Sequence, residues 1–243
     1  MSGFKLFKSS KYFLVLGAGR GGTSLLTAML DCNPSLTVGL EQFSFDFLLG
    51  NKLEGKKKYD LNLRISSFDK ACQKIAKAKK NLWGNKITTE QILALEQCEG
   101  ATFPIYFQNF LNGTIGKGKV IFIVRDGRSC VQSKINRTQQ TYELAVYRWK
   151  FSVKLLNYLK ENHEQLLVLK YEDLVASPKE QLKIACGFLN VSYSAEMLNG
   201  PDNKLLPEIY QNQGLKRETE DIQWPEKWTS DMQVELAALG YEA

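Results

Sequence analysis

Short apolar runs alternate with longer amphipathic stretches along the whole chain. Three of these runs, at 12–17, 119–124 and 165–171, are apolar at odd and even positions alike. That pattern is typical of strands covered on both faces, as in a parallel sheet wrapped by helices. Weaker runs at 36–40 and 81–85 complete a set of five predicted strands.

Helical patterns fill the intervals between these strands. The last helix has the clearest start, because Ser177 precedes Pro178 and Glu180 follows in the first turn. Strands alternating with helices predict an α/β fold built on a parallel sheet. The segment 199–229 has no period and is predicted to be an irregular flap. The predicted helices are 23–32, 42–50, 67–80, 89–98, 103–112, 128–137, 141–161 and 178–189.

Length and composition suit one domain over residues 1–243. The chain has no repeat and no Pro- or Ser-rich linker, and its net charge of +6 is compatible with either a solvated surface or an anionic ligand. The basic run at 55–58 is predicted to be ordinary surface, and we expect no nucleic-acid partner.

Cysteine usage and hydropathy indicate a cytoplasmic protein. The five cysteines are scattered, with no spacing typical of zinc, and therefore predict reduced thiols. The N-terminal apolar run is too short for a secretion signal, and no segment has the roughly 20 apolar residues of a membrane span.

The glycine-rich stretch LGAGRGGTSLL, residues 16–26, matches two phosphate-binding patterns. Gly17, Gly19 and Gly22 form GxGxxG, the dinucleotide pattern, and Glu41 follows at the distance of its ribose-binding carboxylate. With Thr23 and Ser24, the same glycines form a phosphate loop that has threonine where a lysine is usual. Backbone amides at the start of a helix bind phosphate in both cases, so this stretch alone leaves both open.

A second group of residues follows the strand at 119–124. Arg125 stands at the strand's tip, and Ser133 and Arg137 come eight and twelve positions later. If a helix begins near Gly127, these two residues are i, i+4 neighbours on one face. Guanidinium groups and a hydroxyl beyond a strand end predict a second phosphate site, although Arg125 could instead pair with a nearby helix. A nucleotide with phosphates at both ends of an adenosine would occupy both sites.

Three segments together resemble the sulfotransferases that use 3′-phosphoadenosine 5′-phosphosulfate (PAPS). GAGRGGTSLLTAMLDCNPSLTVGLE resembles their 5′-phosphosulfate loop, VRDGRSCVQSKINR their 3′-phosphate motif, and LKYEDLVASPKEQLKIACGFLNV a strand–helix segment. The similarity covers roughly residues 12–190 and is closest in style to the tyrosylprotein and carbohydrate branches. It implies a P-loop NTPase-like three-layer fold with a central parallel sheet.

The resemblance also implies roles for individual residues. Arg20 would stabilise charge at the bridging oxygen, although arginine is a poor proton donor. Lys86 would contact the transferring sulfuryl group. Glu41, on a strand expected beside the loop's own strand, would be the general base, because His163 is predicted to lie on the surface. The implied nucleotide-binding residues are Arg20, Gly21, Gly22, Thr23, Ser24, Arg125, Ser133, Arg137, Tyr171, Lys216 and Arg217.

The expected function is therefore sulfuryl transfer from PAPS to a hydroxyl or amine, with 3′-phosphoadenosine 5′-phosphate (PAP) as product and no metal required. The acceptor is a small molecule, a carbohydrate or a tyrosine-containing polypeptide, and the sequence leaves a homodimer open. Two alternatives remain at this point. One is a nucleotide or small-molecule kinase of the same fold, and the other is a nucleotide-binding module without catalysis.

Overall fold

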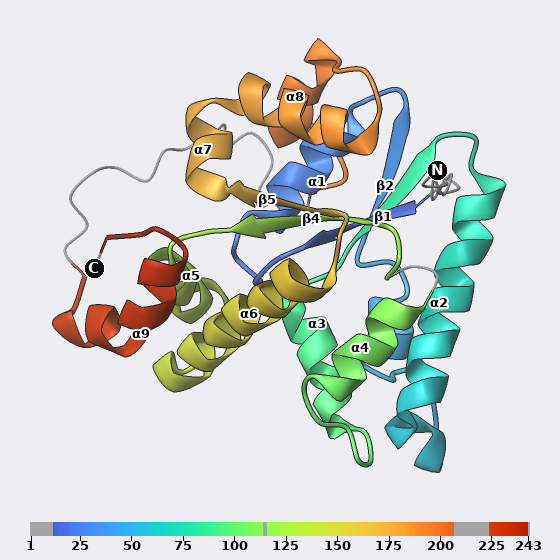
Figure 1. Ribbon diagram of the computed structural model, residues 1–243, viewed down its shortest axis with the longest axis vertical. Helices are drawn as coiled ribbons and strands as arrows, with labels where there is room; N and C mark the ends of the chain where they lie inside the picture. The colour runs from blue at the N-terminus through green and yellow to red at the C-terminus, as the bar shows by residue number, and fades with distance from the viewer. Residues whose placement is uncertain (1–11, 114–115, 207–223, 243) are drawn as a thin grey trace, which may run out of the picture.

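The computed structural model describes residues 12–113, 116–206 and 224–242. In this part of the chain, five parallel strands form one sheet in the order β2-β3-β1-β4-β5 (Figure 1). All strand carboxyl ends therefore meet at one edge of the sheet. The strands are Tyr12–Leu16 (β1), Leu36–Leu40 (β2), Leu82–Lys86 (β3), Lys119–Val124 (β4) and Leu166–Lys170 (β5).

Alternate residues of the central strands pack into two separate hydrophobic layers. In β1, Tyr12, Leu14 and Leu16 face one layer, whereas Phe13 and Val15 face the other. Both sets are buried, because helices cover both faces of the sheet. This explains why the sequence of β1 is apolar at every position.

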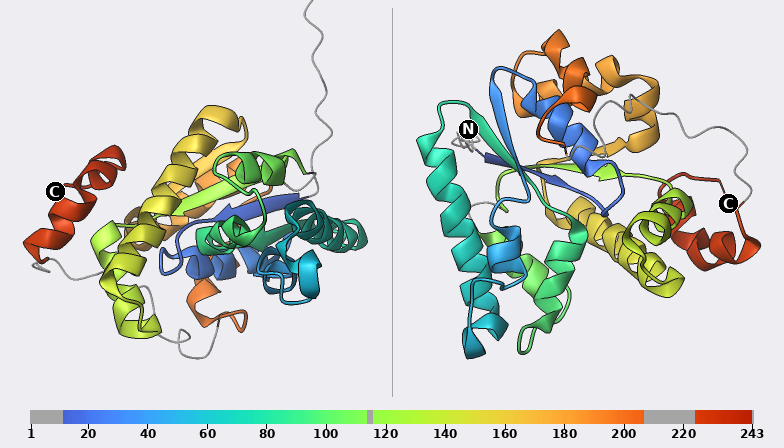
Figure 2. Two further views of the ribbon diagram at one scale, coloured as in Figure 1. Left: turned by 90° about the horizontal axis from the view of Figure 1, so that it is seen from below. Right: turned by 180° about the vertical axis from the view of Figure 1, so that it is seen from behind.

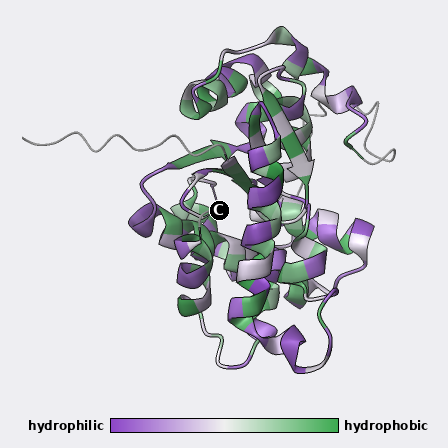
Figure 3. Ribbon diagram, turned by 90° about the vertical axis from the view of Figure 1, so that its right-hand side faces the viewer, coloured by the Kyte–Doolittle hydropathy of each residue, from purple (hydrophilic) through white to green (hydrophobic). Residues whose placement is uncertain are grey.

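Helices cover the two faces unequally, as the views in Figures 1 and 2 show. The strands are mostly green in Figure 3, whereas the surrounding helices mix apolar and polar residues. The face that packs against Phe13 and Val15 carries α1 (Thr23–Asp31), α7 (Tyr171–Ala176) and α8 (Pro178–Leu189). The opposite face carries α2 (Leu61–Ala78), α3 (Thr89–Leu93), α4 (Ile105–Asn112), α5 (Gly127–Thr138), α6 (Tyr142–Asn162) and α9 (Glu226–Ala238).

Two helix predictions on the larger face need correction. The segment predicted as a helix at 42–50 forms only a π-helical turn, Ser44–Leu48, after a bend in which Glu41 and Phe43 both have positive φ. The helix predicted at 67–80 instead begins at Leu61, because the side chain of Asp60 accepts a hydrogen bond from the Leu63 amide at 2.9 Å. An aspartate at the N-cap is a signal that the sequence did offer.

The C-terminal part of the chain contains a helix that the sequence analysis did not predict. The prediction of an irregular flap at 199–229 is wrong at its C-terminal end, where α9 begins after Pro225. The buried Met232 and Leu236, four positions apart, carried the missed helical signal. Residues 207–223 of that segment lie outside the described residues. The helix predicted at 89–98 divides into α3 and a 3₁₀ helix, Ala94–Gln97. Three further short helices were missed: Gly55–Tyr59, α7 and Ala195–Asp202.

The strand order corrects the expected position of Glu41. We expected its strand, β2, to lie directly beside β1, but β3 separates the two. A dinucleotide fold of the usual order would place its second strand next to the first, with the acidic residue beside the loop. The observed order therefore does not fit the dinucleotide interpretation. Within the described residues, no helix is both long and apolar enough to cross a membrane.

Candidate functional site

The glycine-rich loop joins β1 to α1 and has little room for side chains. A Cβ on Gly17 would lie 2.5 Å from the carbonyl oxygen of Ile123, on the neighbouring strand β4. A Cβ on Gly22 would lie 2.3 Å from the ring of Tyr171, and Gly22 also has a φ of 89°. Glycine is therefore required at both positions, by close contact at the first and by contact and backbone conformation at the second.

The N-terminus of α1 has the character of an anion site. Its N-cap is Gly22, which has no side chain to accept a hydrogen bond from the first-turn amides. These amides, at Thr23 and Ser24 among others, have no partner within the helix and carry the positive end of its dipole. The loop predicted to hold a 5′-phosphosulfate thus ends in donors suited to an anion. Thr23 is buried and Ser24 is half-buried.

Arg20 connects this loop to the second predicted phosphate motif. Its Nε donates to the Ser133 hydroxyl at 3.0 Å, and its carbonyl oxygen accepts from Nη1 of Arg125 at 2.8 Å. Its φ of 71° lies in the left-handed region, which a non-glycine residue adopts at a cost. Two motifs far apart in the sequence therefore meet at one residue, which holds a strained conformation.

Arg125 and Tyr171 pack together at the ends of β4 and β5. The Arg125 guanidinium carbon lies 4.5 Å from the Tyr171 ring centroid, an arrangement that favours a cation–π interaction. The ring also packs on Gly22, so three of the predicted nucleotide residues are in contact. Arg137 is one turn beyond Ser133 on α5, as predicted, and its side chain is exposed. Lys216 and Arg217 lie outside the described residues.

Glu41 and Lys86 form an ion pair at the ends of β2 and β3. Lys86 Nζ contacts Glu41 Oε1, and the Glu41 amide donates to the Lys86 carbonyl oxygen at 2.8 Å. The lysine is 4% exposed and the glutamate 22%, both measured on the side chain, so solvent reaches the pair from the carboxylate side. Glu41 has a φ of 57°, which makes it a second strained residue at this edge. The carboxylate is therefore the more open side of the pair, and the ammonium group lies directly behind it.

Asn85 fixes the turn that follows Glu41. It is buried at the end of β3, accepts from the Gln42 amide at 3.1 Å, and donates to the Gln42 carbonyl oxygen at 2.9 Å. This reciprocal pair holds the chain immediately after the carboxylate in place. The sequence analysis missed Asn85, because an asparagine inside a weak strand gives no signal of its partner.

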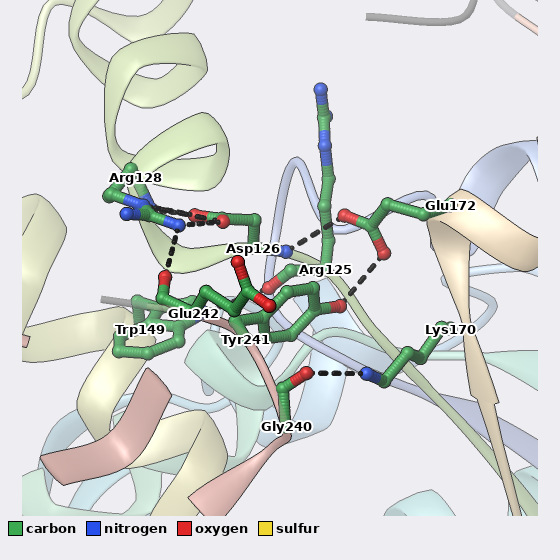
Figure 4. A network of polar contacts seen from close by, with 9 residues as sticks. All are labelled: Arg125, Asp126, Arg128, Trp149, Lys170, Glu172, Gly240, Tyr241 and Glu242. Atoms are coloured by element: carbon green, nitrogen blue, oxygen red, sulfur yellow. Dashed lines mark hydrogen bonds and ion pairs between the residues drawn. The ribbon is translucent and has the colours of Figure 1, made fainter. Parts of the chain in front are cut away.

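A polar network joins the C-terminal end to the turn that carries Arg125 (Figure 4). The Tyr241 hydroxyl donates to Glu172 at 2.8 Å, and the same carboxylate accepts from the Asp126 amide at 3.0 Å. Nearby, Arg128 donates to the Glu242 carbonyl oxygen at 2.9 Å while pairing with Asp126. Burial and the adjacent Glu172 charge raise the pKa of Tyr241, so its hydroxyl remains a donor. This network holds the start of α5.

The histidine lies at the wrong end of the sheet for the site. His163 is half-buried rather than at the surface, and its Nε2 lies 3.0 Å from the carbonyl oxygen of Gly118, just before β4. The predicted site is at the carboxyl ends of the strands, whereas Gly118 precedes the amino end. Among the described residues, no group of three or more His, Cys, Asp or Glu side chains is arranged to hold a metal ion.

Comparison with known sequences identifies the family of this chain. The sequence model of the sulfotransferase family matches residues 13–195. Protein-tyrosine sulfotransferase 2 of Gallus gallus is 24% identical over 205 residues, which cover 81% of this chain and 55% of that protein. Protein-tyrosine sulfotransferase of Drosophila melanogaster is 22% identical over 252 residues, covering 93% and 50% respectively. The chain thus spans about half the length of these curated relatives.

Solved structures share the fold at low sequence identity. The sulfotransferase domain of the Synechococcus PCC 7002 olefin synthase matches with a TM-score of 0.68 and 16% identity, over 98% of each chain. A mouse sulfotransferase complexed with PAP matches with a TM-score of 0.56 and 13% identity, over 97% of this chain and 91% of that one. The predicted P-loop NTPase-like three-layer fold is confirmed.

Proposed function

This chain belongs to the sulfotransferase family, and from that membership we propose that it transfers a sulfuryl group from PAPS to an acceptor hydroxyl. The observation that carries the proposal is the contact of Arg20 with both Arg125 and Ser133. It brings the loop suited to a 5′-phosphosulfate against the motif suited to a 3′-phosphate. One nucleotide with anionic groups at both positions can therefore reach both sets of donors.

The residues at this edge fit such a donor. The uncapped start of α1 supplies amides, and Arg20 and Arg125 supply positive charge. Tyr171, packed against Arg125, offers an aromatic surface beside the proposed nucleotide. PAPS would supply the sulfuryl group and a phosphate leaving group. Protein cations suffice for this charge in our proposal, so no metal ion is required.

Glu41 is proposed to accept the acceptor's proton. As the acceptor oxygen bonds to sulfur, the bond from sulfur to the phosphate oxygen breaks, and that oxygen keeps the electron pair. Arg20 would stabilise the charge that develops there, and Lys86 would stabilise the sulfuryl oxygens. The contact between Lys86 and Glu41 supports this assignment, because it places a carboxylate and an ammonium group side by side.

The names of the relatives suggest a first acceptor to test. Both are called protein-tyrosine sulfotransferases, so we propose the phenolic hydroxyl of tyrosine in a polypeptide. A cytoplasmic location is a further proposal, supported by the five cysteines, all of which are free thiols in the structure.

Calorimetric titration of the whole chain with PAP, and separately with ATP and magnesium, tests the donor assignment. We expect PAP to bind more tightly than ATP. Binding of ATP without PAP would overturn the proposal in favour of a kinase. The acceptor is tested by incubation with PAPS and tyrosine-containing peptides, followed by mass spectrometry for the gain of one SO₃ group. PAP binding with no transfer to peptides, small phenols or carbohydrates would instead indicate a non-catalytic nucleotide-binding module.

A further inference from the structure

A carboxylate that the proposed reaction does not use lies directly against the glycine-rich loop. The Gly19 amide donates to both oxygens of Glu90, at 3.0 Å to Oε1 and 2.9 Å to Oε2. Glu90 is in the first turn of α3, which follows β3. This contact crosses from one strand connection to another, 71 positions apart in the sequence.

Lys134 of α5 neutralises this carboxylate. Its Nζ contacts Glu90 Oε1, and the two side chains are 2% and 15% exposed, respectively. Burial by itself raises the pKa of Glu90, but the Lys134 ammonium group and the Gly19 amide together hold it below its usual value. The glutamate is therefore ionised and the pair carries no net charge.

An ion pair at this place needs a reason other than stability. Removing two charges from water is unfavourable, and apolar residues of similar volume often stabilise a buried position as well or better. A carboxylate beside a loop that binds an anion would also repel the ligand if Lys134 did not compensate it. The position of the pair therefore indicates a role in the structure of the loop, because Glu90 binds the Gly19 amide.

The pair helps to fix the conformation of Arg20. On one side, Glu90 holds the amide of the preceding residue, and on the other, Arg125 holds the carbonyl oxygen of Arg20 at 2.8 Å. α5 contributes two adjacent residues, since Ser133 binds the Arg20 side chain and Lys134 binds Glu90. A left-handed φ at a non-glycine residue persists only where the surroundings impose it. These contacts impose it at Arg20.

We propose that Glu90 and Lys134 are positioning residues that hold the Gly19 amide, and with it the backbone that leads into Arg20, so that the Arg20 guanidinium is aimed at the reacting end of the donor. This rests on the proposed sulfuryl transfer. Arg20 would act on charge that develops during the reaction, and PAP lacks the sulfuryl group. Loss of the contacts that Glu90 and Lys134 make therefore lowers turnover far more than it weakens PAP binding. A misplaced reacting group can reduce rate by about 100-fold.

The test compares the double variant Glu90→Gln/Lys134→Met, which keeps the side-chain volumes and removes both charges, with the wild-type chain. Turnover is followed as release of PAP from PAPS with 4-nitrophenol as acceptor, and with water as acceptor. PAP affinity is measured by calorimetry and stability by urea unfolding. We expect PAP affinity within about threefold of wild type and a rate about 10- to 100-fold lower. The matched control, Glu99→Gln/Lys183→Met, removes one charge of each sign from exposed positions and leaves both values unchanged.

Conservative variants keep the test decisive if the double variant does not fold. Lys134→Arg keeps the positive charge and is expected to retain the wild-type rate. Glu90→Asp shortens the side chain and withdraws the carboxylate from the Gly19 amide, so we expect a lower rate with PAP affinity maintained. Wild-type rates in the double variant, or in Glu90→Asp if the double variant is unfolded, would overturn the positioning role alone. Failure of the wild-type chain to bind PAP would overturn the proposed function and this role with it.

Discussion

Nη1 of Arg125 donates a hydrogen bond of 2.8 Å to the carbonyl oxygen of Arg20 across 105 positions of sequence. The arginine that ends β4 therefore supports the backbone of the arginine in the β1–α1 loop. The two predicted phosphate motifs share this contact, so a substitution at Arg125 removes a support of the Arg20 backbone.

Arg125→Ala is expected to weaken PAP binding. Hydrogen bonds to charged groups contribute about 1.5–3 kcal/mol, which corresponds to about 10- to 150-fold in affinity. Calorimetry with PAP and with 5′-AMP checks the cause, because 5′-AMP lacks the 3′-phosphate. The loss should be larger for PAP than for 5′-AMP, and equal losses for both would show that Arg125 does not recognise the 3′-phosphate. Lys183→Ala, at an exposed position on α8, is the control.

Glu41→Gln is expected to lower turnover by about 10²–10⁴-fold, because a positioned general base contributes about that much. PAP affinity should stay near the wild-type value, since Glu41 is at the end of β2, two strands away from β1 in the sheet. Steady-state rates with PAPS and a tyrosine-containing peptide measure the effect. Glu180→Gln, an exposed residue of α8, serves as the matched control. Unchanged turnover in Glu41→Gln would remove the residue from this role.

Tyr241→Phe tests the network shown in Figure 4. The change removes one donor to Glu172, which also binds the Asp126 amide. For a partly buried hydrogen bond we expect a loss of about 1 kcal/mol in the free energy of unfolding. Urea denaturation measures this loss, and Tyr59→Phe, at an exposed ring, is the comparison. Equal stability of the two variants would mean that the C-terminal contact does not support the start of α5.

Arg64→Met is expected to destabilise the fold by at least about 3 kcal/mol, because several buried carbonyl groups lose their donor. Arg64 is fully buried, and its guanidinium binds acceptors from the segments that follow Glu41 and α3. Denaturant unfolding measures the change, with Lys70→Met on the exposed side of the same helix as control. Similarly small losses of stability in Arg64→Met and Lys70→Met would show that the contacts of the Arg64 guanidinium do not stabilise the fold. The acceptors are the carbonyl oxygens of Phe47, Leu48, Lys58 and Ala94 and the thiol of Cys98.

His163→Gln is expected to change the pH dependence of stability and not the chemistry. Burial lowers the pKa of His163 below its ordinary 6.5, although the Gly118 carbonyl and Glu164 act in the opposite direction. As the pH falls below 6.5, the unfolded chain binds more protons at this residue than the folded chain does. The contribution of His163 to folding stability is therefore complete above pH 6.5 and is lost as the pH falls. The midpoint temperature of thermal unfolding should fall more steeply for the wild type than for the variant as the pH is lowered from about 7 to 5. Loss of turnover at neutral pH would contradict the position of His163 away from the site.

Sequence periodicity was most informative where local physical chemistry decides the structure. The strands at β1 and β4 are apolar at consecutive positions because both faces are covered, and Pro178 starts α8 as predicted. Periodicity failed at 42–50, where the apolar spacing is helical but Glu41 and Phe43 are left-handed and bend the chain. Those conformations depend on contacts with β3, such as the one between Gln42 and Asn85, and no local pattern encodes them.

By itself, the sequence determined the alternation of strands and helices, the glycine loop before a helix, and the family to which these motifs belong. Spacing along one chain carries that information, because strand burial and loop geometry act over a few residues. The tertiary structure decided the strand order, which places β3 between β2 and β1 and so brings Lys86 to Glu41. It alone decided that Glu90 and Lys134 meet at Gly19, since their contact joins α3 to α5 across the loop.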